Sequence, residues 1–557
     1  MLIPEILADL TYKAIRKAQK KGDLGKFDIP PVVVQPPRNP EFGDLATSVC
    51  MQMARLARMA PLKIAEIVAG HLAESEVIES VQAAHPGFLN FTLSHRWLAQ
   101  QVEAIHAAGE TWGHVGLGQG KRVQVEYGSA NPTGPLHVGF GRNVVLGDGI
   151  ANVLAAAGYD VHREYYLNDG GTQVELLGQS LYARYVQLLG RETEFPEDGY
   201  QGEYIVDWAR QIVEAEGERY LDMPAAEAQA RMREIGLQKA VEGIREDCAR
   251  LQIQYDNWFS EKSLYDDGTY GRVMSLLRAK DLLYTQDGAV WFNAMQLGGD
   301  KDEVVVRSNG LPGYFASDIA YHYNKFTLRG FEWVIDVWGA DHQGHVPRMY
   351  AMMQALGLDP DALTLILYQM VTIIQGGESV ILSRRAGTLV LLREILEDVG
   401  PDATRFFLLQ RSADSQMDFD VDLAKAQSEE NPVYYVQYAH ARIASVLRTA
   451  QERGWADWSD GDVGLLTHPK ELDLIRKMLQ LPEVVTRAAT ELAPHHLCYY
   501  AQDLASAFHS FYQECRVVSS APEDVAITKA RLKLVCAAQH TLANALRIIG
   551  VSTPDRM

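Results

Sequence analysis

The sequence predicts an α/β protein in which a doubly wound parallel sheet lies between an α+β N-terminal domain and an all-helical C-terminal domain. Strand-like and helix-like segments alternate over about 109–375, with an acidic, helix-rich insertion at about 185–280, and this alternation is typical of a parallel sheet. From about 426 to the end only helical periodicity remains. A chain of 557 residues also exceeds one ordinary core. We therefore expect domains at 1–108, 109–375 and 426–557, with a connecting segment at 376–425.

The N-terminal domain combines helical and strand signals. A polar, proline-rich passage at 36–40 breaks the helical pattern, and the apolar run at 87–93 has the composition of a short strand. No repeat or low-complexity segment interrupts the domain.

Two stretches of the central domain predict the halves of its sheet. In the first, Val123, Val125 and Tyr127 alternate with polar residues, which predicts a strand that buries one face, and the following helix should end at Gly158 as its C′ residue. In the second half we expect a strand at 333–338, a helix at 347–356 and a strand at 364–368.

The loop at 129–142 (SANPTGPLHVGFGR), between the first strand and its helix, is the most informative segment of the chain. A glycine-containing loop that enters a helix directs free backbone N–H groups and the positive end of the helix dipole at an anion. His137 adds a side-chain donor. The loop therefore predicts a nucleotide phosphate site, although an ordinary Gly/Pro turn with a surface histidine has the same pattern.

Composition restricts the class of protein and its partners. No run of about 18 uncharged apolar residues occurs and the first residues have no secretory pattern, so we expect no membrane partner and a cytoplasmic location. The five cysteines are scattered without a CxxC pair, which predicts neither disulfides nor a zinc site. The net charge of −20 predicts that any contact with RNA is confined to local basic patches.

The segment at 126–142 resembles the HIGH-motif region of class I aminoacyl-tRNA synthetases, and its SANPTGPLHVG stretch is similar to arginyl-tRNA synthetases in particular. The resemblance continues through most of the chain in the blocks YYLND (165–169), YFASDIAYH (314–322), WGADH (338–342), DFD (418–420) and NPVYYVQYAHAR (431–442). It implies a Rossmann-like catalytic domain, a C-terminal anticodon-binding domain and an N-terminal domain that touches the outer corner of tRNA.

The implied activity is the ATP-dependent attachment of L-arginine to tRNA(Arg) through an arginyl-adenylate, for translation. ATP with Mg²⁺, L-arginine and tRNA(Arg) are the implied partners, and we expect a monomer. The resemblance assigns catalysis to His137, Gly139, Ser383 and Arg384, and ATP binding to Gly134, His137, Gly139, Phe140, Gly339, Asp341, His342, Ser383 and Arg384.

Selection of arginine requires an acid that faces its guanidinium group. Tyr314 and Asp318 stand four residues apart, so they share a face of a helix, and a carboxylate accepts two parallel bonds from the planar guanidinium. A helix face with one solvated acid would have the same spacing. The resemblance assigns the guanidinium to this pair, the amino and carboxylate ends of arginine to Glu126 and Asn131, and a further contact to Gln343.

The chain departs from the family pattern at two places. Phe140 replaces the second histidine of the HIGH motif, and in the KMSKS-like loop Ile381 and Arg384 replace the two lysines. Loss of a transition-state donor commonly costs on the order of 10² to 10³ in rate. Arg142, Arg384 and Arg385 are the candidates to supply the missing charge. A tRNA-binding relative without catalysis is the alternative.

The helix that should begin at Asn431 and Pro432 carries the candidate tRNA contacts Tyr434, Tyr438 and Arg442 at four-residue steps. Aromatic and arginine side chains on one face suit stacking on unpaired bases, and they equally suit a helical core.

Two other functions remain as alternatives. A cysteine-specific synthetase would require a thiol-selecting metal site, and a nucleotidylyltransferase would leave the helical domain unexplained.

Overall fold

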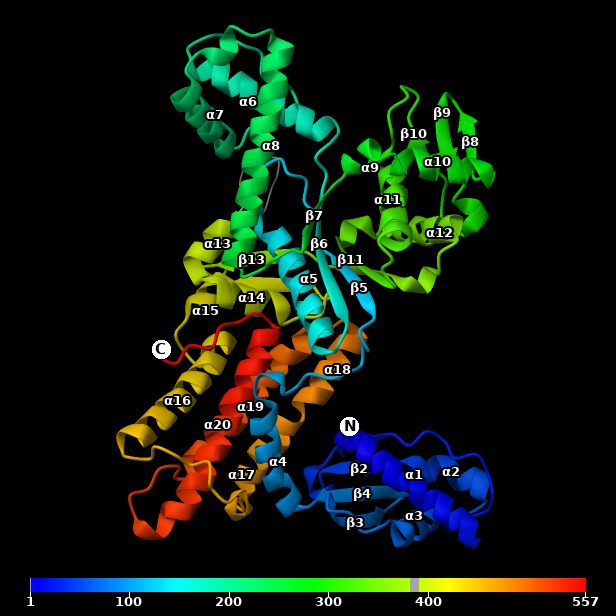
Figure 1. Cartoon of the computed structure of the whole chain (residues 1–557), viewed down its shortest axis with the longest axis vertical. Helices are drawn as coiled ribbons and strands as arrows, with labels where there is room; N and C mark the ends of the chain where they lie inside the picture. Colours follow the sequence, from blue (N-terminus) through cyan, green and yellow to red (C-terminus); the bar gives the residue numbers. More distant parts are fainter. Residues whose placement is uncertain (1, 381–389) are drawn as a thin grey trace.

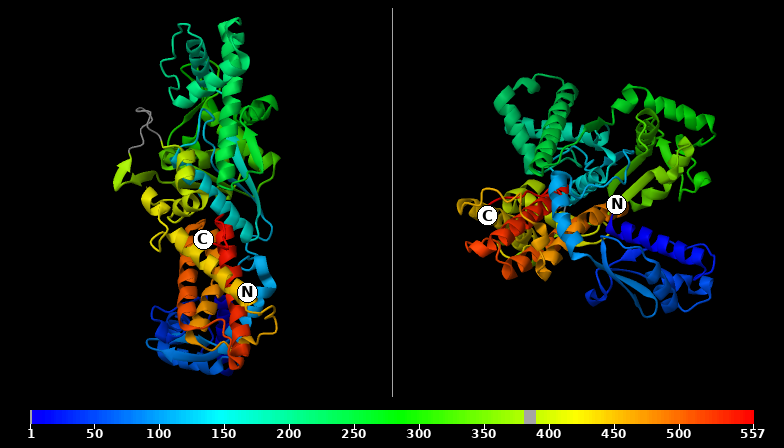
Figure 2. Two further views of the ribbon diagram at one scale, coloured as in Figure 1. Left: turned by 90° about the vertical axis from the view of Figure 1, so that its left-hand side faces the viewer. Right: turned by 60° about the horizontal axis from the view of Figure 1, so that its bottom comes forward.

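The structure is a computed structural model that describes residues 2–380 and 390–557. The parallel sheet lies near the middle of an elongated molecule, with two lobes above it in the view of Figure 1 and two helix-containing units below it. In Figure 1 and in the left view of Figure 2, the N-terminal unit and the C-terminal helices lie at the opposite end of the molecule from helices α6 (Thr172–Leu188), α7 (Glu203–Glu216) and α8 (Ala225–Arg250).

The N-terminal unit is α+β, as the sequence predicts. Its antiparallel sheet has the strand order β1-β2-β4-β3. The elements are α1 (Ile3–Lys21), β1 (Val34–Gln35), β2 (Leu45–Thr47), α2 (Val49–Ala57), α3 (Pro61–His71), β3 (Ile78–Ala84) and β4 (Phe88–Leu93). The predicted strand at 87–93 is β4.

The next helix, α4 (His95–Ala108), packs against the C-terminal helices α17 (Pro469–Leu479) and α20 (Val525–Ile548) rather than against this sheet. The chain after it is also bonded to that domain, since Trp112 donates its indole N–H to the carbonyl of Met478 at 3.3 Å. Asn544 donates to the carbonyl of Gly109 at 2.8 Å. The predicted N-terminal domain, 1–108, includes α4, because sequence periodicity carries no information on which elements pack together.

The central sheet is parallel and has the order β12-β11-β5-β6-β7. Its strands and the helix after β5 are β5 (Arg122–Glu126), α5 (Val138–Ala156), β6 (Asp160–Leu167), β7 (Asn257–Ser260), β11 (Trp333–Gly339) and β12 (Leu363–Tyr368). Gly158 has φ +87° one residue after the C-cap of α5, as predicted.

The expectation that β5 buries one face is wrong, because Gln124 and Glu126 are buried as well as Val123 and Val125. Helix α5 covers one face so closely that a Cβ on Gly147 would lie 2.2 Å from the Tyr127 side chain. The other face lies under the end of α11 (Tyr314–Tyr323) and the turn that follows it, from which Lys325 reaches Glu126. A central parallel strand is covered on both sides, so its polar inward residues must find partners in the interior.

The region expected as an insertion contains both an appended lobe and a strand of the sheet. Helices α6 (Thr172–Leu188), α7 (Glu203–Glu216) and α8 (Ala225–Arg250) form a lobe whose apolar core is separate from that of the sheet. The chain then returns as β7, which pairs with β6, well before residue 280. The four residues of β7 are too few for their periodicity to be seen within a helical stretch.

A second lobe follows β7 and has a core of its own. It contains the three-stranded antiparallel sheet β10-β9-β8 and the helix that bears Asp318. Its elements are α9 (Ser263–Asp266), α10 (Thr269–Ala279), β8 (Leu283–Gln286), β9 (Ala289–Phe292), β10 (Glu303–Val306), α11 (Tyr314–Tyr323) and α12 (Val346–Leu356).

A small sheet, β14-β13-β15, and three short helices connect the central sheet to the C-terminal domain. They are β13 (Val371–Gln375), β14 (Glu378–Val380), α13 (Leu392–Val399), α14 (Pro401–Leu409), β15 (Met417–Asp420) and α15 (Val421–Lys425). The C-terminal domain is helical, as predicted, with α16 (Pro432–Glu452), α17, α18 (Leu481–Glu491), α19 (His495–Glu514) and α20. Asn431 caps α16 by accepting from the backbone N–H groups of Val433 and Tyr434. Within the described part of the chain, no helix is both long and apolar enough to span a membrane.

Candidate active site

The predicted phosphate loop lies at the carboxyl edge of the sheet, between β5 and α5. Gly128 adopts φ +83° and donates its N–H to Asn143, which in turn donates to the carbonyl of Val337 on β11. The Tyr165 hydroxyl both accepts from the N–H of Ala130 at 3.0 Å and donates to its carbonyl at 3.2 Å. These bonds fix the backbone of the loop to two neighbouring strands before any ligand binds.

His137 is the N-cap of α5, and its Nδ1 accepts from the backbone N–H of Gly139 at 3.2 Å. A neutral imidazole that accepts at Nδ1 carries its hydrogen on Nε2, so the ring is a donor at that atom. A Cβ on Gly139 would lie 2.9–3.0 Å from the imidazole, so a larger residue at this position would displace the His137 ring from its present place. Phe140 packs on the same ring, with 4.7 Å between centroids.

The segment after the KMSKS-like loop is paired with the HIGH segment. Val138 donates to the carbonyl of Val390 at 3.1 Å, and Leu392 donates to the carbonyl of Leu136 at 2.9 Å. Ser383 and Arg384, two of the predicted catalytic residues, lie outside the described residues. The described chain nevertheless resumes beside the N-terminus of α5.

The expectation that Arg142 supplies charge to the site is wrong. Its guanidinium is buried and donates to three backbone carbonyls, those of Gln369, Ser412 and Ser415, at 2.6–2.9 Å. Arg142 therefore ties α5 to the connecting segment. A motif shows which residue types occur, but it does not show which way a helix faces at each of them.

Further predicted contacts of the nucleotide and of arginine lie at the same edge. β11 ends at Gly339, and the predicted nucleotide contacts Asp341 and His342 follow in the 3-10 turn η6 (Ala340–His345), where both are exposed. The predicted arginine contact Gln343 is exposed in the same turn, and Asn131, also predicted for arginine, is exposed and donates to Gln173 at 2.7 Å. Carboxyl ends of parallel strands meet at one edge of a sheet, which is where ligands bind in such folds.

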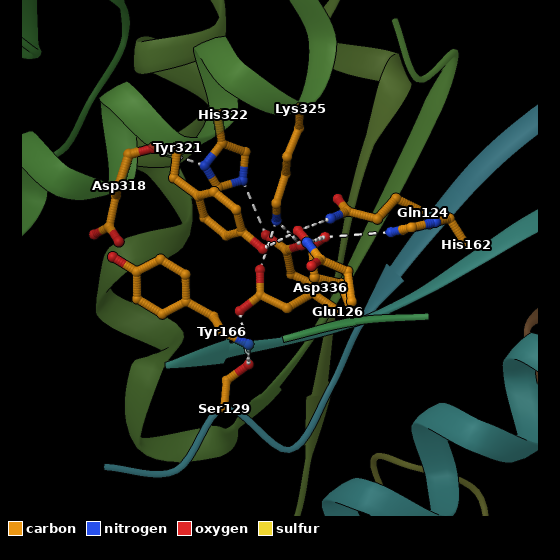
Figure 3. Close-up of polar contacts among 12 residues, drawn as sticks. Gln124, Glu126, Ser129, His162, Tyr166, Asp318, Tyr321, His322, Lys325 and Asp336 are labelled. Carbon is orange, nitrogen blue, oxygen red and sulfur yellow. Dashed lines mark hydrogen bonds and ion pairs between the residues drawn. The ribbon is translucent and has the colours of Figure 1, made fainter. Parts of the chain in front are cut away.

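Tyr314 and Asp318 both lie on α11, as the four-residue spacing predicts. The Tyr314 ring is 58% exposed and lies under the guanidinium of Arg307, which is 5.2 Å from the ring centroid. The Asp318 carboxylate and the Tyr166 hydroxyl point into the same space (Figure 3).

Asp318 lies in a strongly acidic environment. Burial, and then the nearby carboxylates of Glu261 and Glu126, raise the pKa of Asp318 to about 8. Burial likewise raises the pKa of Glu261, against the opposing effect of a hydrogen bond from Ser317. A desolvated group of acids with raised pKa values has a high affinity for a cation that brings its own hydrogen-bond donors.

Glu261 is a candidate site residue that sequence patterns do not identify. This residue directly follows β7, and its backbone N–H donates to the carbonyl of Leu167 at the end of β6. Glu261 could be predicted as an acidic residue that follows a strand at the carboxyl edge of the sheet. That prediction requires β7 to be recognised as a strand from the sequence.

Three carboxylates stand side by side across the sheet, because the strand register places Asp336 of β11 and Glu164 of β6 on either side of Glu126 of β5. Two cations pair with this row and leave one negative charge when all three acids are ionised. The Lys325 ammonium donates to Glu126 at 2.5 Å and to Asp336 at 2.8 Å (Figure 3). Arg329 donates to Glu164 at 2.7 Å.

Burial raises the pKa of Glu126 to about 7, although Lys325 opposes the rise. For Asp336, the effect of burial is outweighed by Lys325 and His322, which lower its pKa to about 2. Both cations lie on the π-helical turn η5 (Asn324–Leu328) and the residue after it. Sequence periodicity missed them because a π-turn does not follow the 3.6-residue repeat.

The predicted tRNA contacts lie together in the C-terminal domain. The Tyr434 and Tyr438 rings are stacked with 6.2 Å between centroids and 10° between planes, and Tyr438 also stacks on His509. The exposed Arg442 lies over Tyr438 and Tyr512 and donates to the Tyr438 hydroxyl at 2.7 Å. The rings of Tyr434 and Tyr438 are half-buried rather than part of the interior, so their outer edges face solvent.

Comparison with known proteins identifies the class and then the family. Residues 101–418 match the family model "tRNA synthetases class I (R), catalytic domain", which is the class that the parallel sheet and the HIGH segment define. Residues 6–93 match "Arginyl tRNA synthetase N terminal domain", and residues 436–557 match "DALR anticodon binding domain". The chain belongs to the arginyl-tRNA synthetase family.

Curated relatives agree over the full length. The chain is 47% identical to the arginine–tRNA ligase of Dehalococcoides mccartyi over 100% of this chain and 99% of the relative. It is 49% identical to that of Caldanaerobacter subterraneus, over 99% of this chain and 98% of the relative. A solved structure described as a putative arginyl-tRNA synthetase from Campylobacter jejuni matches with TM-score 0.76 and 32% identity, covering 84% of this chain and all of the other. The family assignment excludes the cysteine-specific and nucleotidylyltransferase alternatives.

Proposed function

We propose that this protein attaches L-arginine to tRNA(Arg) in two steps. In the first, a carboxylate oxygen of arginine attacks the α-phosphorus of ATP, and the bond from that phosphorus to pyrophosphate breaks. In the second, a ribose hydroxyl at the 3′ end of tRNA attacks the carbonyl carbon of the arginyl-adenylate and AMP leaves. Neither step needs a covalent bond to the enzyme, so positioning and charge stabilisation provide the catalysis.

The observation that supports arginine as the substrate is the acidic cluster of Asp318, Glu261 and Glu126 at the carboxyl edge of the sheet. Guanidinium is a planar cation with five donors, and carboxylates that cannot be solvated by water bind it strongly. We assign the guanidinium to Asp318, with Tyr314 and Glu261 beside it.

Glu126 and Asn131 are the proposed partners of the amino and carboxylate ends of arginine, with Gln343 as a further contact. Glu126 ends β5, and Asn131 lies in the loop that connects β5 to α5. This arrangement suits an arginine whose guanidinium lies at α11 and whose carboxylate lies toward α5. In this pose the substrate carboxylate lies on the side of the N-terminus of α5.

ATP is proposed to bind at the N-terminus of α5. The Nε2 of His137 and the helix dipole are suited to stabilise charge on the phosphates. Gly134, Gly139, Phe140, Gly339, Asp341 and His342 complete the proposed ATP site, together with Ser383 and Arg384. No group of three or more His, Cys, Asp or Glu side chains suited to a metal occurs among the described residues. MgATP is the proposed substrate, with Mg²⁺ bound through the phosphates.

Two surfaces are proposed to bind tRNA. The stacked face of Tyr434, Tyr438 and Arg442 suits unpaired bases of the anticodon loop. In the N-terminal unit, α1 presents exposed cations that suit phosphates. Such a local basic surface is needed for contact with RNA because the whole protein has a net charge of −20. These side chains are Lys13, Arg16, Lys17, Lys20 and Lys21. A monomeric state and a cytoplasmic location are part of the same proposal.

Competition between arginine and citrulline tests the substrate assignment. Citrulline has nearly the same shape but replaces the charged guanidinium with a neutral urea group, so it would leave the acids of the cluster unpaired. We expect charging with arginine and a preference over citrulline of at least about 10³ in kcat/KM, as for other sites built to bind a polar group. Comparable rates for the two amino acids would refute the acidic cluster as the specificity site.

A further inference from the structure

Lys325 is a fully buried lysine at the centre of the candidate site. Its side chain is 0% exposed, and its ammonium lies between Glu126 and Asp336, at 2.5 Å and 2.8 Å from their carboxylate oxygens. The ammonium also lies 4.1 Å from the centroid of the Tyr321 ring. A buried ammonium is costly unless it is paired, so these contacts are the reason that it is tolerated here.

The backbone delivers Lys325 to this position. The register of β5 and β11 places Glu126 directly opposite Asp336, and two carboxylates at this separation repel each other. The turn η5 follows α11 without a break, so the helix that carries Asp318 also carries the lysine seven residues later. Movement of this helix would shift both residues together.

The Lys325 ammonium compensates one of its two neighbouring carboxylates, so one negative charge remains to pair with a cationic group of a substrate. Glu126, Asp336 and Lys325 together carry one net negative charge when both acids are ionised. The other neighbour of Asp336 is His322, whose Nε2 lies 2.9 Å from the Asp336 carboxylate. Glu126 has Ser129 at 2.9 Å on its other oxygen, and a carboxylate offers about four acceptor positions. Glu126 thus has positions left for further donors, and the surplus charge belongs to it.

We propose that Lys325 is a positioning residue for recognition of the α-amino group: it fixes the orientation of the Glu126 carboxylate and favours the ionised form of that carboxylate beside Asp336. The inference rests on the proposed function, because it assumes that Glu126 receives the amino group of arginine. Lys325 acts through Glu126 and does not itself touch the substrate.

The test compares Lys325→Met with the wild type for three ligands. Arginine is measured as the substrate in tRNA charging. Agmatine keeps the guanidinium and an amino group, whereas 5-guanidinopentanoate keeps the guanidinium and carboxylate but lacks the α-amino group, and both are measured as competitive inhibitors. We expect the variant to raise the KM for arginine and the Ki for agmatine at least tenfold. The Ki of 5-guanidinopentanoate should stay within about twofold.

Lys533→Met is the matched control, because Lys533 is also a largely buried, paired lysine, bonded to Glu103 and to the carbonyl of Gly461, but lies on α20. It should leave all three constants unchanged. If Lys325→Met does not fold, Lys325→Gln, which keeps a donor but removes the charge, is subjected to the same comparison. In a Glu126→Gln background the Lys325 substitution should add no further discrimination between arginine and 5-guanidinopentanoate.

The outcomes separate this inference from the proposed function. An equal loss of affinity for all three ligands would overturn the inference and leave Lys325 as a structural residue. Unchanged constants in a folded variant would overturn it as well. Failure of the wild-type protein to charge tRNA with arginine would instead overturn the proposed function.

Discussion

Asp318 is the residue on which the specificity of the site depends most. We expect Asp318→Asn to raise the KM for arginine roughly 10- to 100-fold, since each charge-assisted hydrogen bond contributes about 1.5 to 3 kcal/mol. The KM for ATP should change little, because the nucleotide loops are untouched. Steady-state charging kinetics measure both. Asp160→Asn is the control, as this exposed acid begins β6 at the opposite edge of the sheet. An unchanged KM for arginine in the Asp318 variant would show that the assignment is wrong.

The raised pKa of Asp318 predicts that arginine binding depends on pH. With a pKa of about 8, set by burial and by Glu261, Glu126 and Asp336 against the opposing Lys325, the carboxyl is mostly protonated at pH 7 in the empty site. Guanidinium binds the ionised form, so binding releases a proton. The affinity for arginine should therefore rise between pH 6 and 8 and level off above pH 8.

Titration calorimetry in buffers of different ionisation enthalpy measures that proton release directly. The pKa of Glu126, raised by burial to about 7, adds a second component to the rise below pH 7. Asp318→Asn should remove the component near pH 8 and retain the other. Binding of arginine that is independent of pH from 6 to 8.5 would contradict the acidic environment described for Asp318.

His137 provides a third prediction, with a control that the fold itself supplies. His137→Ala should slow adenylate formation by roughly 10² or more, as loss of one preorganised donor does in other enzymes. His468 is also an N-cap histidine, since it accepts from the N–H of Lys470 at the start of α17. His468→Ala should cost comparable stability without slowing the chemistry. Similar rates for the two variants in single-turnover assays would reduce His137 to a structural cap.

At the residue scale, sequence was informative where a motif fixed both residue type and local structure. The four-residue spacing of Tyr314 and Asp318 placed both on one helix, and His137 lies at a helix N-terminus. Arg142 was misassigned because its direction depends on what α5 packs against. Lys325 and Glu261 were missed because their roles arise from strand register and a π-turn, which are tertiary features.

At the scale of single elements, the prediction concerns helix α16 and its proposed contact with tRNA. We expect Tyr438→Ala to raise the KM for tRNA about 5- to 100-fold, because base–aromatic stacking contributes about 1–3 kcal/mol per base. The KM for arginine should not change. Tyr438→Phe keeps the ring and loses only the hydroxyl that accepts from Arg442, so it should remain close to the wild type. An unaltered KM for tRNA in Tyr438→Ala would favour the packing interpretation of this helix face.

The elements that sequence predicted well are those with strong local signals. The Asn431 cap, the helix after it and the strand–loop–helix around His137 follow from side-chain chemistry within a few residues. β7 and the second lobe were not separated from the insertion because short strands in a helical region have weak periodicity. The packing of α4 on α17 and α20 involves residues more than 350 positions apart, for example His106 and Lys533, and no local pattern reports such contacts.

At the scale of the whole molecule, the two steps are expected to be coupled through tRNA. With Ile381 in place of the first lysine of the signature loop, less charge is available to bind pyrophosphate, so binding energy from the tRNA acceptor end should be required. We expect arginine-dependent exchange of pyrophosphate into ATP to be slight until cognate tRNA is added. Ile381→Lys should partly relieve this requirement. Ile381 lies outside the described residues, and brisk exchange by the wild-type protein without tRNA would disprove the coupling.

The central claim is that the acidic cluster of Asp318, Glu261 and Glu126 at the carboxyl edge of the sheet selects arginine for attachment to tRNA. Charging of a total tRNA pool with each of the twenty amino acids in turn tests it most directly. The account predicts that arginine alone is attached, that charging requires ATP, and that it stops when the arginine-accepting tRNAs are filled. Attachment of another amino acid at a comparable rate, or no attachment of arginine by the folded protein, would contradict it.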